Sequence, residues 1–179
     1  MIITSVENKK IKSYALLKNN KIRKEKQLFL IEGMHLCEEA LKKDLLVDLL
    51  VLENTSLEFS YSKEITYVSS NVLKKLSSLA TIPNVIGVCK FITNKKELGN
   101  HLLILDDLAD PGNLGTLIRS AKAFDVDTII LSKNRVDIYN EKVLRSTQGM
   151  IFNMNIIYDD LEVVIPKLRD NGYLILGTD

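Results

Sequence analysis

The sequence predicts an α/β protein in which a small α/β domain precedes a domain built on a parallel sheet. Along the chain, the spacing of apolar residues alternates between the period of two that is typical of strands and the longer period of helices. From residue 101 onward one helix separates each pair of strands, which is typical of right-handed βαβ crossovers. Residues 93–100, TNKKELGN, are polar and contain a glycine, as linkers do. We therefore expect two domains, 1–92 and 101–179, joined by this linker.

In the first half, the polar residues 5–26 predict one or two helices, and an apolar strand is expected at 28–31. A helix at 34–43 would place Leu36, Cys37, Ala40 and Leu41 on one face. The remaining apolar segments predict strands at 47–52, 65–68 and 85–91 and a helix at 70–79.

In the second half, strands are expected at 102–105, 128–131, 155–157 and 173–176, with helices at 112–124, 141–148 and 160–169 between them. In parallel sheets, ligands bind in the loops that follow the carboxyl ends of strands. Gly177 and Thr178 follow the last expected strand and are therefore candidate ligand-binding residues. No covering helix follows them, so we expect these residues to form the N-terminal part of a larger domain.

The composition is that of a globular protein. Of 179 residues, 46% are hydrophobic and 26% are charged, which excludes disordered and collagen-like chains. The apolar runs are too short to span a membrane, and the lysine-rich start lacks the apolar core of a signal peptide, so a soluble, cytoplasmic protein is expected. Cys37 and Cys89 have no second ligand at metal-binding spacing, so we expect reduced thiols and no metal site.

Positive charge is concentrated at the start of the chain. Residues 1–30 carry a net charge of +6, whereas the other residues carry −5. Such a cluster favours a polyanion-binding arm, because neutralising phosphates releases counterions. Lys21, Arg23 and Lys24 are the candidate RNA-binding residues within it. The alternative is an ordinary solvated helix face.

The most informative segment is LDDLADPGNLGTLIRSAKAF, residues 105–124. Helical spacing predicts a sheet-facing side made of Leu114, Leu117, Ile118, Ala121 and Phe124. Asp110 is expected to cap the helix, with Pro111 in its first turn, and Arg119 to reach back over Gly115 toward Asn113. Free backbone N–H groups, an amide and a guanidinium would then suit an anion or a developing oxyanion. The structural alternative is a cap, a packing glycine and a surface charge.

A dinucleotide-binding fold fits this segment poorly. Its fingerprint needs GxGxxG and an acidic residue at the end of the next strand. Here only Gly112 and Gly115 are present, and the next strand ends in Ser132.

A second segment, NEKVLRSTQGMIF at residues 140–152, predicts a helix that Asn140 caps and Gly149 stops. Lys142 and Arg145 share one face of this helix and are candidate RNA-binding residues. Taken alone, this segment is also compatible with an ordinary amphipathic helix.

Residues 105–124 resemble the leading motif of the SpoU (TrmH-like) ribose 2′-O-methyltransferases of the knotted SPOUT superfamily. Residues 140–152 resemble that family's middle motif, written close to PKVVRASxGxxF. The segments FLIEGMHLCEEALK and SSNVLKKLSSLATIPNVIGV are similar to the substrate-binding domain that precedes the SpoU domain. That domain in turn resembles small ribosomal RNA-binding proteins.

The resemblance implies a homodimeric, metal-free enzyme that transfers a methyl group from S-adenosylmethionine to a ribose 2′-hydroxyl of ribosomal or transfer RNA. The family's conserved asparagine falls on Asn113 and its catalytic arginine on Arg119, while Arg145 and Gly149 take the arginine and glycine of the middle motif. Arg119 is then either the general base or an electrostatic stabiliser of the alkoxide. A guanidinium stays protonated in proteins, which favours the second role at least as much.

The third motif of the family, a glycine-rich loop and the segment that threads the knot, is absent from the sequence. We therefore expect no knot in this chain, an incomplete S-adenosylmethionine pocket at Gly177 and Thr178, and no activity of the 179 residues alone. The alternative function is a non-catalytic RNA-binding module.

Overall fold

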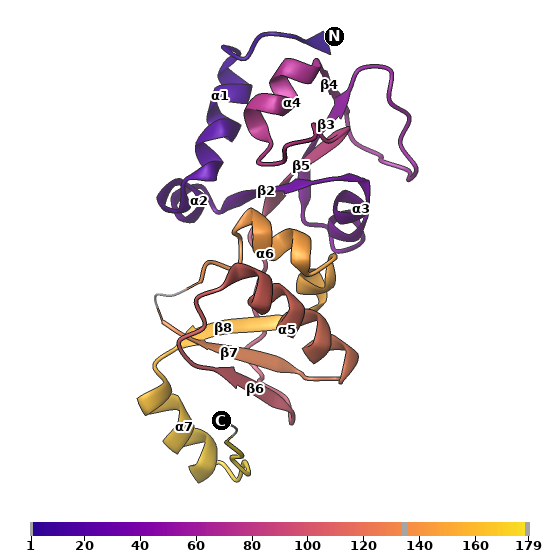
Figure 1. The fold of residues 1–179 in the computed structure, drawn as a ribbon. Coiled ribbons are helices and arrows are strands. Elements are labelled where there is room, and N and C mark those ends of the chain that lie inside the picture. Colours follow the sequence, from indigo (N-terminus) through magenta and orange to yellow (C-terminus); the bar gives the residue numbers. More distant parts are fainter. Residues whose placement is uncertain (1, 134–135, 178–179) are drawn as a thin grey trace.

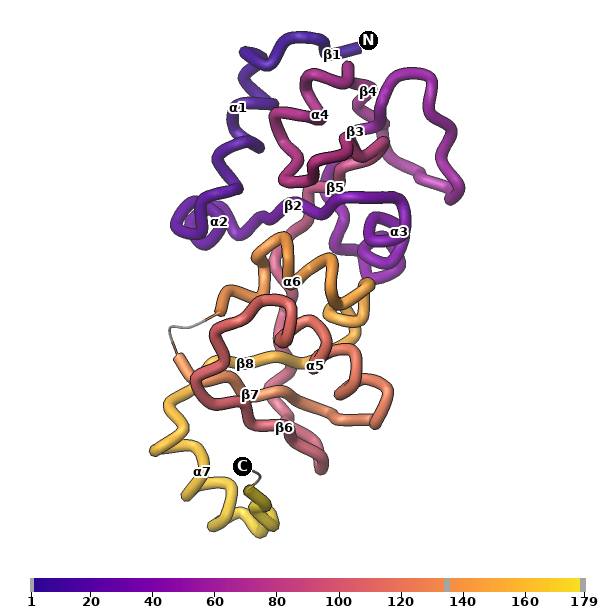
Figure 2. Tube along the Cα trace, viewed as in Figure 1, coloured from indigo at the N-terminus to yellow at the C-terminus, as the bar shows by residue number. Residues whose placement is uncertain are grey.

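The structure, a computed structural model, describes residues 2–133 and 136–177. Within them, the chain forms two sheets that lie one above the other (Figure 1). The first has five strands in the order β1-β4-β3-β5-β2, and the second has three strands in the order β6-β7-β8. A trace of the chain shows that the path crosses from the first sheet to the second once, after β5 (Figure 2).

The first sheet is mixed, since β1 and β3 pair with β4 in parallel while β5 pairs with β3 and β2 in antiparallel. Its strands are β1 (Ile2–Ile3), β2 (Leu28–Glu32), β3 (Leu46–Leu52), β4 (Thr66–Val68) and β5 (Val85–Lys90). The helices around it are α1 (Lys9–Ala15), the 3-10 turn η1 (Leu16–Lys18), α2 (Asn20–Lys26), α3 (Met34–Lys42) and α4 (Ser70–Leu76). The expected elements of this half are present with small shifts of their ends, and β1 is an additional strand too short to produce a sequence pattern.

The second sheet is parallel throughout, as predicted. Its strands are β6 (Leu102–Leu105), β7 (Thr128–Ser132) and β8 (Asn155–Asp159). The helices and turn that connect or follow them are α5 (Pro111–Ala123), α6 (Glu141–Ser146), η2 (Met150–Asn153) and α7 (Leu161–Asp170). Helices α5 and α6 lie on the side of the sheet that faces the first domain, and α7 covers the other side (Figure 1). The central strand β7 has an apolar, buried middle, Ile129 to Leu131, because both of its faces are covered.

The strand expected at 173–176 does not form. No strand ladder joins this segment to the described strands. The side chains of this segment nevertheless alternate between buried and exposed positions. Tyr173 and Ile175 pack in the cluster between the sheet and α7, whereas Leu174 and Leu176 are exposed. The Tyr173 hydroxyl donates to the carbonyl of Gly99 at 2.5 Å. The alternation therefore reflects one buried side, and alternation alone does not supply a strand partner.

Phe124 also departs from expectation, because it is 81% exposed instead of facing the sheet. Helix α5 ends at Ala123, and Asp125 has a positive φ of 53°. The chain leaves the helical path at that point, so the helical spacing no longer determines where the Phe124 side chain lies.

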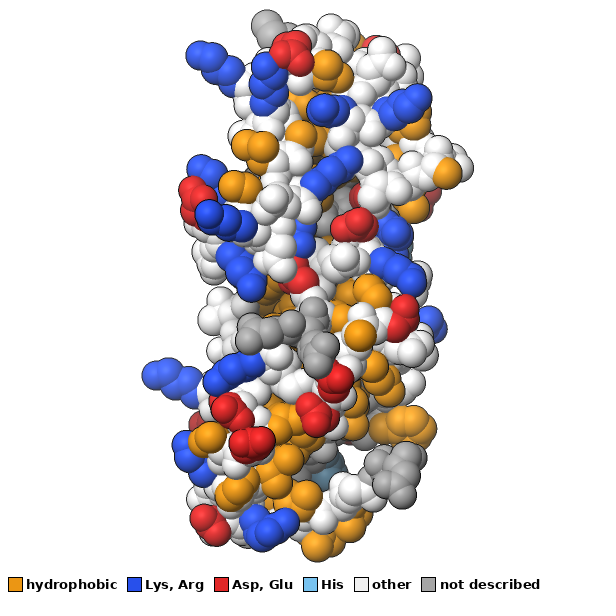
Figure 3. Space-filling view, turned by 60° about the vertical axis from the view of Figure 1, so that its left-hand side comes forward, with side chains coloured by type: hydrophobic (Ala, Val, Ile, Leu, Met, Phe, Trp, Pro, Cys, Tyr) orange, Lys and Arg blue, Asp and Glu red, His pale blue; other side chains and the backbone are white. Residues whose placement is uncertain are grey.

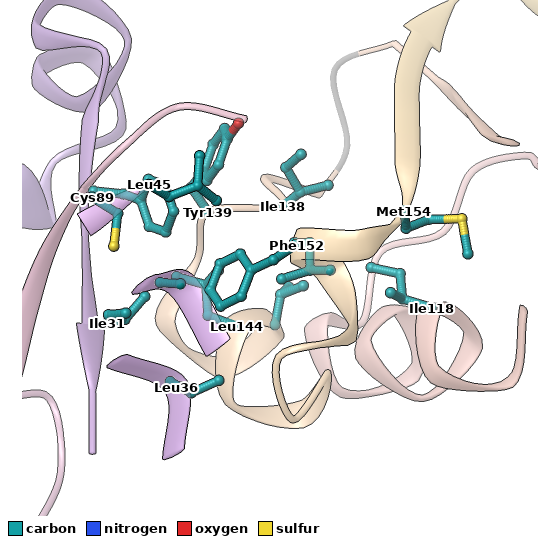
Figure 4. Close-up of a cluster of buried hydrophobic side chains, with 14 of the residues drawn as sticks. Ile31, Leu36, Leu45, Cys89, Ile118, Ile138, Tyr139, Leu144, Phe152 and Met154 are labelled. Atoms are coloured by element: carbon teal, nitrogen blue, oxygen red, sulfur yellow. The ribbon is translucent and has the colours of Figure 1, made fainter. Parts of the chain in front are cut away.

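One hydrophobic core joins the two sheets. Figure 4 shows Ile31, Leu36 and Leu45 of the first domain in the same cluster as Leu144 and Phe152 of the second. The rings of Phe91 and Tyr139 stack across this junction with their centroids 3.9 Å apart. The two halves of the chain are thus packed against each other, and residues 91–101 between β5 and β6 contain neither helix nor strand.

Candidate active site and RNA-binding surface

Helix α5 begins with the predicted cap. An Asp110 carboxylate oxygen accepts a hydrogen bond from the Asn113 backbone N–H at 2.7 Å, and Pro111 occupies the first turn. This backbone hydrogen bond, together with the nearby Lys142 ammonium, lowers the pKa of Asp110. The Asp110 carboxylate therefore stays ionised at neutral pH. It also accepts a hydrogen bond from one of the N–H groups at the start of α5 that would otherwise be free.

Helix α6 packs directly against α5. The two motif segments, residues 105–124 and 140–152, are therefore neighbours in the structure. The Lys142 ammonium lies 3.5 Å from an Asp110 carboxylate oxygen. Gly115 is buried, and a Cβ atom at this position would overlap the Cβ of Ser146. The carbonyl of Val143 would lie only 3.1 Å from that Cβ atom. The glycine is therefore needed for the close approach of the two helix backbones.

Replacing Gly115 by alanine is expected to destabilise the protein. In a helix interior this change ordinarily stabilises by roughly 1 kcal/mol, but overpacking costs about 1–3 kcal/mol, and here the added methyl meets backbone atoms. Urea unfolding checks the result, with Ser120→Ala on the exposed side of the same helix as the control. An unfolding midpoint for Gly115→Ala at or above that of the wild type would contradict this account of the packing.

The side chains of Asn113 and Arg119 are exposed and make no hydrogen bond or ion pair with residues 2–133 or 136–177. The structure does not bring them together. Six residues of helix separate them by about 9 Å along the axis and by about 120° around it. The reach of Arg119 back to Asn113 is therefore absent, and each side chain is free to contact a ligand.

Arg145 contacts the first domain instead of facing solvent alone. Its guanidinium donates to the Ser78 hydroxyl at 2.8 Å and lies 3.8 Å from the Glu32 carboxylate. The Glu32 side chain is only 5% exposed and accepts hydrogen bonds from the Ser77 hydroxyl and from both the N–H and the hydroxyl of Ser78. Arg145 therefore has a structural partner in the first domain, and about a third of its side chain remains accessible.

Gly149 reinforces this contact. Its φ of 84° favours glycine, and a Cβ atom there would lie 2.8 Å from Glu39 of α3. Close by, His35 Nε2 lies 3.2 Å from the carbonyl oxygen of Gln148. The predicted helix stop is thus also a point of close approach between the domains. Sequence reasoning missed Glu32 and Glu39 because nothing local marks a residue whose partner lies more than a hundred positions away.

Arg23 corrects the predicted RNA-binding set. Its side chain is 7% exposed, donates to the carbonyls of Leu17 and Lys18 at 2.9 Å, and lies 2.5 Å from the Asp137 carboxylate. With these partners it has no free face for a phosphate. Its position in a lysine-rich segment concealed this role, because charge counting does not distinguish a buried guanidinium from an exposed one.

The basic segment retains only part of its charge for a ligand. Three of its lysines have protein partners: Lys10 pairs with Asp48, Lys12 with Glu7, and Lys18 donates to the carbonyls of Lys75 and Ser77. Exposed lysines without such partners among the described residues are Lys9, Lys21, Lys24 and Lys26. Figure 3 shows Lys and Arg side chains scattered over this face from top to bottom, and a group of acidic side chains in its lower half.

Of the two predicted cofactor-binding residues, the structure describes Gly177. Gly177 is exposed, and an added Cβ atom would meet nothing within 4 Å. Thr178 lies outside the described residues. Between the carboxyl ends of β6 and β7, the cavity lined by Leu105, Leu114 and Ser132 has a volume of 10 Å³, whereas cofactor sites measure roughly 300–1,000 Å³. Between the ends of these two strands, the described residues therefore leave no room for S-adenosylmethionine.

No cluster of metal-ligating side chains occurs among residues 2–133 and 136–177. In that same part of the chain, no helix has the length and apolarity needed to span a bilayer.

Fold and site together define a class of protein: a small mixed-sheet domain packed on a parallel α/β domain, with an exposed arginine on the helix that follows the first parallel strand. The family model of the SpoU rRNA methylases matches residues 100–179, and that of the MRM3-like substrate binding domain matches residues 8–87. The chain belongs to the SpoU methylase family.

Three known proteins illustrate the similarity. The 23S rRNA (guanosine(2553)-2′-O)-methyltransferase RlmP of Bacillus subtilis is 33% identical, over 98% of this chain and 72% of its own length. The crystal structure of an RNA 2′-O ribose methyltransferase superposes with a TM-score of 0.79 at 29% identity, covering 95% of this chain and 70% of that one. An AdoMet-bound rRNA methyltransferase from Sinorhizobium meliloti shares the fold, with a TM-score of 0.76 at 24% identity over 94% of this chain and 68% of that one.

Proposed function

We propose that this chain is part of an S-adenosylmethionine-dependent enzyme that methylates a ribose 2′-hydroxyl of ribosomal RNA. The observation that carries the proposal is the exposed Arg119 on α5, the helix that follows the first parallel strand. Membership of the SpoU family and the reaction named for the Bacillus subtilis relative support it. The rRNA methyltransferase from Sinorhizobium meliloti with bound AdoMet supports the cofactor.

In this reaction, the chain's own residues bind RNA and stabilise charge. As its proton leaves, the ribose 2′-oxygen gains negative charge, and a guanidinium held near it lowers the energy of that state. Arg119 has no competing protein partner among the described residues, so its charge is available to this oxygen or to a neighbouring phosphate. Asn113 offers an amide to the bound RNA at a separate position of α5. S-adenosylmethionine supplies the methyl group, and homodimer formation and a cytoplasmic location belong to the same proposal.

A transfer assay tests the reaction. The protein from its native source is incubated with tritiated S-adenosylmethionine and ribosomal RNA, which is then hydrolysed with alkali. A 2′-O-methyl group blocks alkaline cleavage, so the label is expected in resistant dinucleotides. Label found only in mononucleotides would indicate base methylation, and no transfer to any RNA would favour the non-catalytic RNA-binding module.

RNA binding through the exposed lysines of α2 predicts a steep salt dependence. The double substitution Lys21→Glu/Lys24→Glu is expected to weaken binding of structured ribosomal RNA and to reduce the slope of log K against log salt by about 2, because each of the two lost phosphate contacts contributes roughly 0.9. Fluorescence anisotropy between about 50 and 200 mM salt measures both quantities. Lys167→Glu/Arg169→Glu on α7 makes the same charge change at exposed positions and serves as the control. Equal losses in the two variants would contradict a specific surface on α2.

The 179-residue chain alone is expected to bind S-adenosylmethionine with a Kd weaker than about 1 mM, a free energy of only about −4 kcal/mol. A small ligand gains affinity by burial in a preformed cleft, and Gly177 offers none. Isothermal titration calorimetry decides the point. Stoichiometric binding at micromolar concentration would show that the described residues suffice for a pocket.

A further inference from the structure

A cleft of 610 Å³ lies between the two domains on the side where the carboxyl ends of β7 and β8 lie. Asn20 and Lys24 of α2 form part of one wall, together with Phe91. Lys133, which follows β7, and Tyr158 of β8 form part of the other wall. Among the described residues, none from α5 or α6 lines it, so the cleft is separate from the candidate active site.

The lining combines positive charge with apolar surface. Lys24 is exposed, and Lys133 has only a loose ion pair with Asp159 at 3.7 Å. The acidic group in the lining, Asp137, is already neutralised by Arg23. The apolar surface comes from half-buried or exposed side chains, namely Phe91, Ile92, Val136 and Tyr158, because the other apolar lining residues are buried.

The walls of the cleft are held in place by hydrogen bonds. The Tyr139 hydroxyl accepts from the backbone N–H of Ile92 at 2.9 Å. The Tyr158 hydroxyl donates to the carbonyl of Val136 at 2.7 Å and accepts from the N–H of Ile138 at 3.1 Å. Burial raises the pKa of both tyrosines to about 12, so neither adds negative charge. A ligand therefore meets a preformed surface, which reduces the ordering cost of binding.

Free amides complete the lining. The side chains of Asn20 and Asn94 make no hydrogen bond with the described residues, so each offers a donor and an acceptor to a ligand. Proteins recognise unpaired nucleotides by this combination, namely apolar or aromatic contact with the face of the base, amides on its edge and cations on the phosphate. An acidic peptide would pair with the lysines but would leave the amides and the apolar wall without contacts.

We propose that this cleft binds one unpaired nucleotide of the RNA substrate, with its phosphate at Lys24 and Lys133 and its base against the apolar wall. The inference rests on the proposed function and deepens it. One rim of the cleft is the basic helix α2, and the other is the carboxyl edge of the parallel sheet, where ligands bind in such folds. An RNA strand held on α2 is thereby led toward the methyltransferase domain.

The test compares a fluorescein-labelled single-stranded RNA of twelve nucleotides with a duplex RNA of the same sequence. Asn94→Trp fills the cleft from an exposed loop position, and Lys133→Glu reverses one of its charges. Each is expected to weaken binding of the single strand at least about fivefold, the lower end of the effect of one base contact, and to change duplex binding less than about twofold. Ser60→Trp and Lys167→Glu are matched exposed controls and are expected to change neither affinity.

The other outcomes overturn the assignment in distinguishable ways. Unchanged single-strand affinity in both cleft variants, or an equal loss for the duplex, would exclude the cleft as a nucleotide site while leaving RNA binding on α2 intact. Adenosine monophosphate that binds more tightly than the labelled strand would make a free nucleotide the ligand. Displacement of the strand by a polyglutamate peptide from the wild type but not from Asn94→Trp would assign the cleft to an acidic peptide. If the wild type binds neither RNA, the proposed function fails and the inference fails with it.

Discussion

Arg119→Ala is expected to reduce methyl transfer by about 10²–10³-fold, the range for removing one group that stabilises a developing oxyanion. Its side chain is exposed and makes no contact with the described residues that the fold would lose, so thermal stability should not change. The loss should appear mainly in kcat, because the charge on the ribose oxygen develops only in the transition state. Initial rates of methyl transfer by the native protein, measured over a range of RNA concentrations, separate the change in kcat from the change in KM.

Two variants show whether the effect belongs to this side chain. Arg119→Lys is expected to recover only part of the rate, because lysine keeps the charge but lacks the planar fork that binds two oxygens. Lys122→Ala removes a cation from the same helix and is expected to leave the rate within about twofold of the wild type. Near-normal turnover in Arg119→Ala would remove this residue from the mechanism.

Arg23→Ala is expected to lower the free energy of unfolding by about 3–5 kcal/mol, because breaking a buried ion pair leaves one charge without its partner. The Asp137 carboxylate is only 17% exposed, and the carbonyls of Leu17 and Lys18 would lose their donor as well. Chemical denaturation, followed by circular dichroism, measures the change. Lys21→Ala, two positions away and exposed, is the control and should cost little.

A double variant separates the unpaired charge from general damage. Arg23→Met/Asp137→Asn removes both charges and keeps an acceptor for the Tyr139 N–H, which bonds to the Asp137 side chain at 3.0 Å. It is expected to be more stable than Arg23→Ala, because replacing both charges of a buried pair costs less than removing one. A double variant that is less stable than Arg23→Ala would show that the ion pair is not the source of the effect.

The sequence predicts most elements of the fold because burial on one or two faces leaves a periodic pattern. The helix at Pro111–Ala123 has a cap at Asp110 and a proline in its first turn, and both are found. The segment at 173–176 shows the limit of this reasoning, since its alternation is real but no neighbouring strand pairs with it. Pairing depends on residues distant in the chain, and a local pattern contains no information about them.

The same limit governs the site. The helix patterns place three candidate residues on the exposed sides of α5 and α6, and the structure has them exposed there: Asn113, Arg119 and Lys142. The ion pairs of Arg23 and Arg145 could not be predicted from the local sequence, because each partner lies more than a hundred positions away along the chain. The interdomain cleft was missed for the same reason, since its lining comes from four separate stretches of the chain.

The contacts of α6 with the first domain restrict how the two halves of such a protein can be exchanged in evolution. Arg145 fits Glu32 and Ser78, and Gly149 fits Glu39. A chimera that joins residues 93–179 to the first domain of a distant relative would inherit a mismatched surface, even with the linker unchanged. The family's two domains are therefore expected to diverge as one unit, with compensating changes across this contact, whereas the exposed lysines of α2 are free to vary with the RNA.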